Sequence, residues 1–245
     1  MTVRLPWDLL AVIHSADPGR PRLTWYDDEP GPTNGERIEL SARVLINWVS
    51  KAGNLLQDDL AAEPDTRVWL DLPTHWRAIY WALATWAVGA TVVLTDGVRA
   101  GHGADADVVV TSDPATAAAA RGDAVLVSLP ALARSHPDAS AAGAIDEARE
   151  LSTHGDEFSP FVEPESESIA LVVGDAETPY ADLVVARPDW GSAPRVALSG
   201  ALDDTLVAAL SAWALDGSVI LSRGTDAAPP DRLRSEGVTL NLQEP

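Results

Sequence analysis

The stretch ALVVGDAETPYADLVV, at residues 170–185, places a polar turn between two apolar runs. Its candidate functional residues are Gly174, Asp175, Ala176, Glu177, Thr178 and Asp182. A glycine and a threonine are compatible with binding an anion, whereas three carboxylates at close range repel one. Which ligand, if any, this turn can bind is therefore the first question about the function of the protein.

Other patterns that do chemistry are missing from the sequence. The chain has no cysteine, which excludes disulfides, thiolate metal sites and cysteine nucleophiles. Its five histidines stand singly, and the acidic pairs lack the spacing of a calcium loop, so we expect no metal site. No G-x-S-x-G, G-x-G-x-x-G or P-loop motif occurs. A Ser–His–Asp triad assembled from distant segments stays open, without positive support.

The composition limits the class of partner. Seventeen basic and 37 acidic residues give a formal charge of −20, and such a field repels nucleic acid. Lys51 is the only lysine, so chemistry that needs a catalytic lysine has one candidate. No apolar run is long enough to span a membrane and no cleavable leader is evident, so we expect a cytoplasmic protein without membrane contact.

Strand and helix patterns alternate along most of the chain, which predicts a layered α/β fold with largely parallel sheets flanked by helices. Predicted strands are 22–27, 36–40, 67–72, 91–94, 106–111, 124–129, 168–173, 182–186, 195–199, 218–222 and 237–242. Predicted helices are 41–56, 74–89, 114–123, 141–155, 201–215 and 228–237, with Thr74 as a cap and Gly89 as a stop signal. The acidic, proline-containing stretch 155–167 is expected to be a mobile connector between subdomains 1–154 and 168–245.

This order of elements resembles the N-terminal half of the adenylate-forming superfamily, which includes acyl-CoA synthetases, nonribosomal peptide adenylation domains and luciferases. Segments 21–56, 65–94 and 206–221 are similar to that half in sequence as well as in order. The resemblance covers nearly the whole chain and implies the subdomain fold of those enzymes. None of the three segments is catalytic in the superfamily.

The resemblance also places the superfamily's phosphate-binding loop, T-S-G-T-T-G-x-P-K-G, on residues 174–183. There Gly174 and Thr178 remain, while Asp182 stands near the position of the loop's lysine. The superfamily's histidine motif has no counterpart at residues 199–202, and the chain ends before the adenine-binding motif and the lid. The resemblance thus implies a truncated, catalytically degenerate relative with no catalytic residues and no cofactor.

Two tryptophans are candidate contact residues. Trp81 points away from the apolar face of helix 74–89, so it is either buried by a second layer or part of an interface. Burial is the preferred interpretation for Trp81. Trp190 lies in the loop RPDWGSAP and is expected to be exposed, which makes it the better interface candidate.

Three functions are compatible with these observations. The first is a non-catalytic protein that binds an unknown protein partner or itself. The second is a module for a small acyl or nucleotide-like ligand. The third is an adenylate-forming ligase completed by a separate lid subunit. The acidic turn at 174–182 favours the first two over catalysis.

Overall fold

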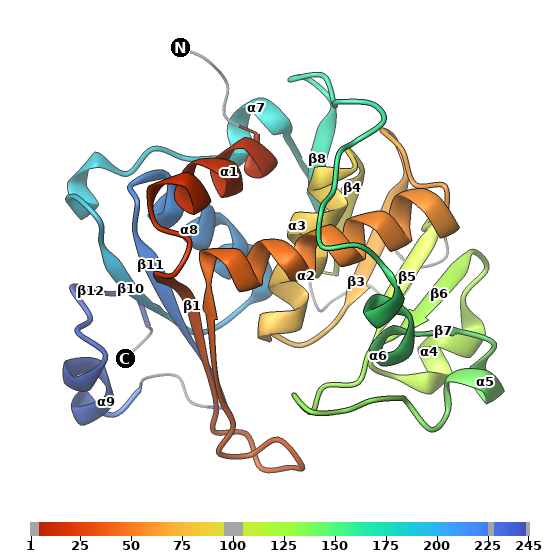
Figure 1. The fold of residues 1–245 in the computed structure, drawn as a ribbon, viewed down its shortest axis with the longest axis horizontal. Coiled ribbons are helices and arrows are strands. Elements are labelled where there is room, and N and C mark those ends of the chain that lie inside the picture. Colours follow the sequence, from red (N-terminus) through yellow and green to blue (C-terminus); the bar gives the residue numbers. More distant parts are fainter. Residues whose placement is uncertain (1–4, 96–104, 225–227, 244–245) are drawn as a thin grey trace. The chain divides into compact units, whose positions relative to one another are not determined.

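The structure is a computed structural model that describes residues 5–95, 105–224 and 228–243 (Figure 1). Two compact units make up the chain. Unit 1 comprises residues 47–72 and 80–183, and unit 2 comprises the residues up to 46, 73–79 and those from 184 onward. Each contains a largely parallel sheet with helices, which confirms the predicted fold class.

The division into units does not follow the boundaries expected at 154 and 168. Strand β1 (Pro21–Asp27) pairs in parallel with β11 (Ser218–Arg223), so the N-terminal strand shares a sheet with the C-terminal part of the chain. The acidic segment 155–167 lies inside unit 1 and does not join the two units. Local patterns could not reveal this, because pairing between distant strands leaves no local signal.

Unit 1 is built on a seven-stranded sheet of order β7-β6-β5-β3-β4-β8-β9. All neighbouring pairs are parallel except β8 with β9, which are antiparallel. The strands are β3 (Arg67–Asp71), β4 (Thr91–Leu94), β5 (Val108–Thr111), β6 (Asp123–Leu126), β7 (Ile145–Asp146), β8 (Ile169–Val173) and β9 (Ala176–Pro179). Strands β4 and β5 are buried along their whole length, as expected for the interior of a parallel sheet.

The helices of unit 1 depart from the prediction in several stretches, of which residues 141–155 are the longest. Residues 141–155 form no continuous helix, because Gly143 ends the first helix with φ +68° and a short strand follows. The helical elements are α2 (Ala42–Asn54), the π-helix η1 (Leu55–Asp59), α3 (Trp76–Ala87), α4 (Pro114–Ala119), α5 (Ala139–Ala142), α6 (Glu147–Glu150), η3 (Leu151–Thr153) and α7 (Tyr180–Leu183). The first residues of α2 and α3 are assigned to unit 2.

Trp81 belongs to the core of unit 1. Its side chain is 0% exposed, so the interpretation of burial is confirmed and Trp81 is not an interface residue. Nearby on the same helix, the Trp86 indole donates a hydrogen bond to the Ala170 carbonyl in β8 at 2.8 Å. The Tyr180 hydroxyl donates to the Ala90 carbonyl at 2.7 Å. Large aromatic side chains thus connect α3 to strand β8, and α7 to the residue that precedes β4.

Unit 2 is built on a five-stranded sheet of order β12-β10-β11-β1-β2. The strands predicted at 22–27 and 36–40 are present as β1 and β2, which pair antiparallel as a hairpin, and the other neighbours are parallel. The remaining elements are β2 (Arg37–Ser41), β10 (Arg195–Leu198), β12 (Leu240–Asn241), α1 (Pro6–Ala16), η4 (Pro188–Trp190), α8 (Leu202–Ala214) and α9 (Pro230–Ser235). The strand predicted at 237–242 is present as the short edge strand β12.

The start of α3 is capped by a residue that the sequence did not indicate. His75 Nδ1 accepts a hydrogen bond from the Arg77 backbone N–H at 3.1 Å. Thr74, the predicted cap, instead donates its hydroxyl to the Gly200 carbonyl at 2.8 Å. His75 is fully buried against Trp25, and burial lowers the pKa of its imidazole to about 2. This histidine is therefore neutral at physiological pH.

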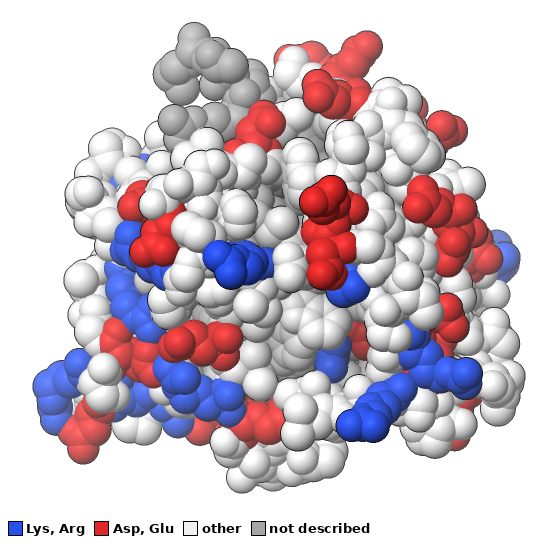
Figure 2. Space-filling view, viewed as in Figure 1, with Lys and Arg blue, Asp and Glu red and all other residues white. Residues whose placement is uncertain are grey.

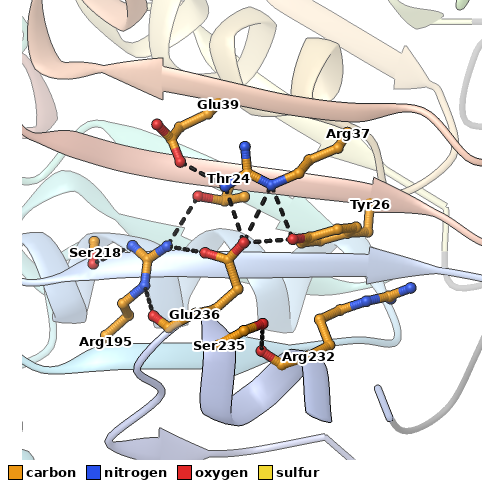
Figure 3. A network of polar contacts seen from close by, with 9 residues as sticks. All are labelled: Thr24, Tyr26, Arg37, Glu39, Arg195, Ser218, Arg232, Ser235 and Glu236. Carbon is orange, nitrogen blue, oxygen red and sulfur yellow. Dashed lines mark hydrogen bonds and ion pairs between the residues drawn. The ribbon is translucent and has the colours of Figure 1, made fainter.

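A network of ion pairs attaches the end of α9 to the sheet of unit 2 (Figure 3). The Glu236 carboxylate accepts hydrogen bonds from Tyr26, from Arg37 at 2.9 Å and from Arg195 at 2.5 Å. Burial would raise the pKa of Glu236, but these donors outweigh that effect and lower it to about 2. Arg232 on α9 pairs with both oxygens of Asp28 as well. Figure 2 shows acidic and basic side chains interspersed over one face of the molecule.

Replacing Glu236 with glutamine should lower the free energy of unfolding by about 2 kcal/mol at pH 7, because three donors lose their charged acceptor. A carboxylate with a lowered pKa stabilises the fold above its unfolded pKa and loses this effect as the pH falls. The difference between wild type and Glu236→Gln should therefore shrink as the pH falls from about 5 toward 2. Urea denaturation at pH 7, 4 and 3 measures this difference.

Glu39→Gln is the matched control, since Glu39 also pairs with Arg37 but is 37% exposed. Its effect should stay below about 0.5 kcal/mol. Equal stability of Glu236→Gln and wild type at pH 7 would show that the network does not hold α9 in place.

Candidate functional site

The turn that resembles a phosphate-binding loop forms a tight β-hairpin. Strands β8 and β9 pair antiparallel with Val173 opposite Ala176, which leaves only Gly174 and Asp175 between them. Gly174 has φ +58°, and glycine is favoured at the first of two hairpin positions for that reason. The predicted strand 182–186 is absent, because the chain continues into α7 and then into irregular structure.

The hairpin occupies backbone groups that an anion would need. Residues 176–179 pair with β8, and Gly174 N–H donates to the Leu94 carbonyl at 3.4 Å. The N–H groups of Tyr180 and Ala181 donate to the carbonyls of Ser168 and Ser166 at 3.0 and 2.9 Å. A phosphate cradle requires several N–H groups that point at one open position. In this turn those groups complete a sheet instead.

The side chains of the hairpin add charge of the wrong sign for a nucleotide. Asp175, Glu177 and Asp182 are exposed, and Ala176 between them is exposed as well. Thr178 is half-buried in the edge strand. The predicted positions are thus brought together, but they form an acidic strand edge. Charged residues at an edge also discourage pairing with other strands.

A separate cavity lies in unit 2 at the carboxyl end of β10. It has a volume of about 500 Å³, within the range of small-molecule sites. We call it the β10 pocket, and its lining residues are Arg187, Trp190, Leu198, Ser199, Gly200, Ala201, Asp204, Thr205, Val207, Ala208, Ser211 and Leu242. Trp190 is half-buried in its wall, so the expected exposure of this residue is only partly correct.

The topology of the sheet explains why a pocket forms there. The chain leaves β10 through α8 to reach β11 on one side, and then passes through α9 to β12 on the other side of β10. Open α/β sheets bind ligands at points where successive connections diverge in this way, outside the carboxyl ends of the strands. The β10 pocket occupies such a point.

Thr205 carries a hydroxyl that the protein leaves without a partner. The side chain lines the pocket, is 2% exposed, and its Oγ1 has no hydrogen-bond partner in the described part of the chain. Its backbone N–H donates to the Ala201 carbonyl at 3.1 Å, which fixes it in the first turns of α8. A buried polar group without a partner costs stability, and this hydroxyl is available to donate to an atom placed in the pocket.

Two charged side chains of opposite sign line the pocket. The exposed Arg187 lies over the Trp190 ring, with its guanidinium carbon 5.9 Å from the ring centroid. Asp204 contributes a carboxylate on the first turn of α8. Leu198, Val207, Ala208 and Leu242 supply apolar wall. The pocket can therefore hold a small molecule with an apolar body and one anionic group, whereas several negative charges would be repelled.

Metal binding finds no support in the described residues. They contain no group of three or more histidine and acidic side chains arranged to hold a metal ion. Within the same residues, none of the helices combines the length and apolar character needed to cross a bilayer. The sequence indicated Trp190 but missed Thr205, because an unsatisfied hydroxyl is visible only once its surroundings are known.

Comparison with solved structures shows extensive similarity of fold. An acyl-CoA synthetase of Brucella canis matches 95% of this chain with a TM-score of 0.72 and 16% identity. The N-terminal domain of FACL13 from Mycobacterium tuberculosis matches 97% with a TM-score of 0.71 and 13% identity. The fold is that of the N-terminal part of adenylate-forming enzymes. At such identities the similarity shows the fold alone.

Similarity in sequence is found to one curated protein. A TIGR03089 family protein of Mycobacterium tuberculosis is 40% identical over 151 residues, which cover 59% of this chain and 58% of that protein. No family model matches the sequence. The chain thus spans 58% of this relative and 46% of the Brucella canis enzyme.

The hairpin predicts that ATP does not bind measurably at physiological salt. The N–H groups of Gly174, Tyr180 and Ala181 are engaged, and Asp175, Glu177 and Asp182 repel a triphosphate. Isothermal titration calorimetry should give no dissociation constant below about 100 μM, which corresponds to about −5.5 kcal/mol. Tighter binding that weakens on Asp182→Lys would show that the hairpin opens to receive the nucleotide.

Proposed function

We propose that this chain is a non-catalytic protein with an adenylate-forming fold, and that it acts by binding a small organic acid in the β10 pocket. The observation that carries the proposal is the buried Thr205 hydroxyl, which lines a cavity of about 500 Å³ and lacks a partner among the described residues. A ligand atom would complete its hydrogen bond. The hairpin at the position that resembles the phosphate loop supports the non-catalytic part of the proposal.

The chemistry of the ligand follows from the walls. Arg187 is the one cationic side chain in the lining, so it selects a single negative charge such as a carboxylate. The Trp190 ring and the aliphatic lining accept an apolar body. Asp204 disfavours a dianion or a polyphosphate in the same space. An aryl or short acyl carboxylic acid combines these features.

The fold similarity supports this ligand class without showing it. One match is the N-terminal subdomain of Klebsiella oxytoca NpsA in complex with anthranilyl-AMSN, with a TM-score of 0.64 and 14% identity over 98% of this chain. That subdomain holds a ligand with an aromatic acyl part. We carry only this class of group to the present chain, and no adenylation reaction.

Titration with benzoate and hexanoate, with benzamide as the neutral control, tests the ligand class. The two carboxylates should bind and benzamide should bind at least about tenfold more weakly, because it lacks the charge for Arg187. Thr205→Val and Arg187→Gln should each weaken binding by about tenfold, while thermal stability stays nearly unchanged. Arg134→Gln, an exposed arginine of unit 1, should have no effect.

Three results would contradict the proposal. Absence of binding by benzoate and hexanoate at millimolar concentrations would remove the ligand class. Exchange of pyrophosphate into ATP by the chain, alone or with a separate lid subunit, would show catalysis and support the ligase alternative. Binding that persists unchanged in Thr205→Val and Arg187→Gln would place the site elsewhere.

A further inference from the structure

The acidic segment 155–167, which the sequence predicts to be mobile, is fastened to α2. Lys51 donates a hydrogen bond to the His154 carbonyl at 2.6 Å. One turn later, the Asn54 side chain donates to the carbonyls of Gly155 and Glu157 at 3.1 and 3.0 Å. Figure 1 shows the segment crossing this helix. The backbone is thus held at successive positions by side chains of a single helix.

Similar hydrogen bonds from side chain to backbone continue into the π-helix η1. The Gln57 amide donates to the Ser159 carbonyl at 3.3 Å and accepts from the Phe161 N–H at 2.9 Å. Phe158 packs directly on Gly53, where a Cβ atom would lie 3.0 Å from its ring. The segment is therefore bound along one side of α2 and η1, and its conformation is set before any partner arrives.

This fixed segment presents apolar side chains to water. Phe161 is 79% exposed and Val162 is 53% exposed, although the chain contains only two phenylalanines. Glu163 follows directly and is exposed. Because the backbone is already ordered, burial of Phe161 by a partner would cost little further backbone entropy. Preordered aromatic side chains are effective anchors in interfaces.

The β10 pocket offers the matching surface. Its volume of about 500 Å³ exceeds what a phenylalanine side chain needs, and its wall contains Trp190 and aliphatic side chains. Arg187 stands at Trp190 and is exposed. With Phe161 in the pocket, Glu163 would lie near the Arg187 guanidinium. The two surfaces are thus complementary in both apolar character and charge.

We propose that Phe161 of one copy inserts into the β10 pocket of a second copy, with Glu163 beside Arg187. Phe161 is 79% exposed, and the pocket is lined by residues of unit 2 alone. The contact joins two different surfaces, so further copies can add head to tail beyond the dimer. The inference rests on the proposed function only in that it uses the same pocket.

A small contact of this kind is weak, so association should appear in sedimentation velocity at concentrations between about 10 μM and 1 mM. The average mass should rise past that of a dimer as the concentration increases. Phe161→Ala should raise the dissociation constant at least about tenfold. Leu132→Ala is the matched control, because Leu132 is 92% exposed in the same unit and should leave association unchanged.

Mixing two defective variants gives the sharpest test. Phe161→Ala keeps its pocket and Trp190→Ala keeps its phenylalanine, so each alone should be monomeric and an equimolar mixture should form a complex that stops at one copy of each. Exchange of the two charges provides a second test. Glu163→Arg and Arg187→Glu should each weaken association, and the double variant should restore it.

A wild-type chain that stays monomeric up to about 1 mM would overturn the inference, and so would association that survives Phe161→Ala or a mixture that forms no complex. Failure of the proposed function can be distinguished from failure of this inference by measuring benzoate binding to the same variants. Phe161→Ala retains the intact pocket, so benzoate should still bind to it. Loss of benzoate binding with intact association would reject the ligand class alone.

Discussion

The pairing of β8 with β9 is the interaction on which the functional account depends. A segment that follows a buried strand can either leave its N–H groups open to an anion or use them to extend the sheet. Here the N–H groups of Gly174, Tyr180 and Ala181 are all bonded to carbonyls of the same unit. Since buried backbone donors must be satisfied, opening this hairpin for a phosphate would cost the hydrogen bonds that it now makes. In this fold, which is that of the N-terminal part of adenylate-forming enzymes, the three N–H groups are therefore engaged within unit 1.

The two units contribute differently to this account. Unit 1 contains the hairpin and the fastened acidic segment, while the β10 pocket belongs entirely to unit 2. The pocket depends on the divergence of the chain on either side of β10 and not on the hairpin. The proposed binding in the pocket therefore does not require any contact made by the hairpin. The fold sets the place of the pocket, and the residues in its walls set what it binds.

Much of the fold could be predicted because its signals are local. Helix α3 follows from apolar spacing and from Gly89, which has the positive φ expected of a stop signal. The hairpin of β1 and β2 follows from a turn rich in glycine and proline. In contrast, the pairing of β1 with β11 joins segments almost 200 residues apart, and no local pattern encodes it.

The candidate site was only partly predictable for the same reason. Acidic residues at 175, 177 and 182 indicated that a nucleotide would be repelled, but not that β9 would form, because Glu177 and Pro179 are poor strand residues. In the sequence, Thr205 is an ordinary helix residue. Only the structure shows that its buried hydroxyl has no hydrogen-bond partner among the described residues. The composition of segment 155–167 predicts mobility. The sequence does not show that the segment is held in place, because the side chains that hold it lie about 100 residues earlier in the chain.

Amide hydrogen exchange measured by NMR, with and without ATP, tests the central claim most directly. The N–H groups of Gly174, Tyr180 and Ala181 should exchange slowly in the free protein, since all three are hydrogen-bonded, and saturating ATP should not change their rates. Fast exchange at these positions in the free protein, followed by protection when ATP is added, would contradict the account. That result would show an open loop that closes around a phosphate.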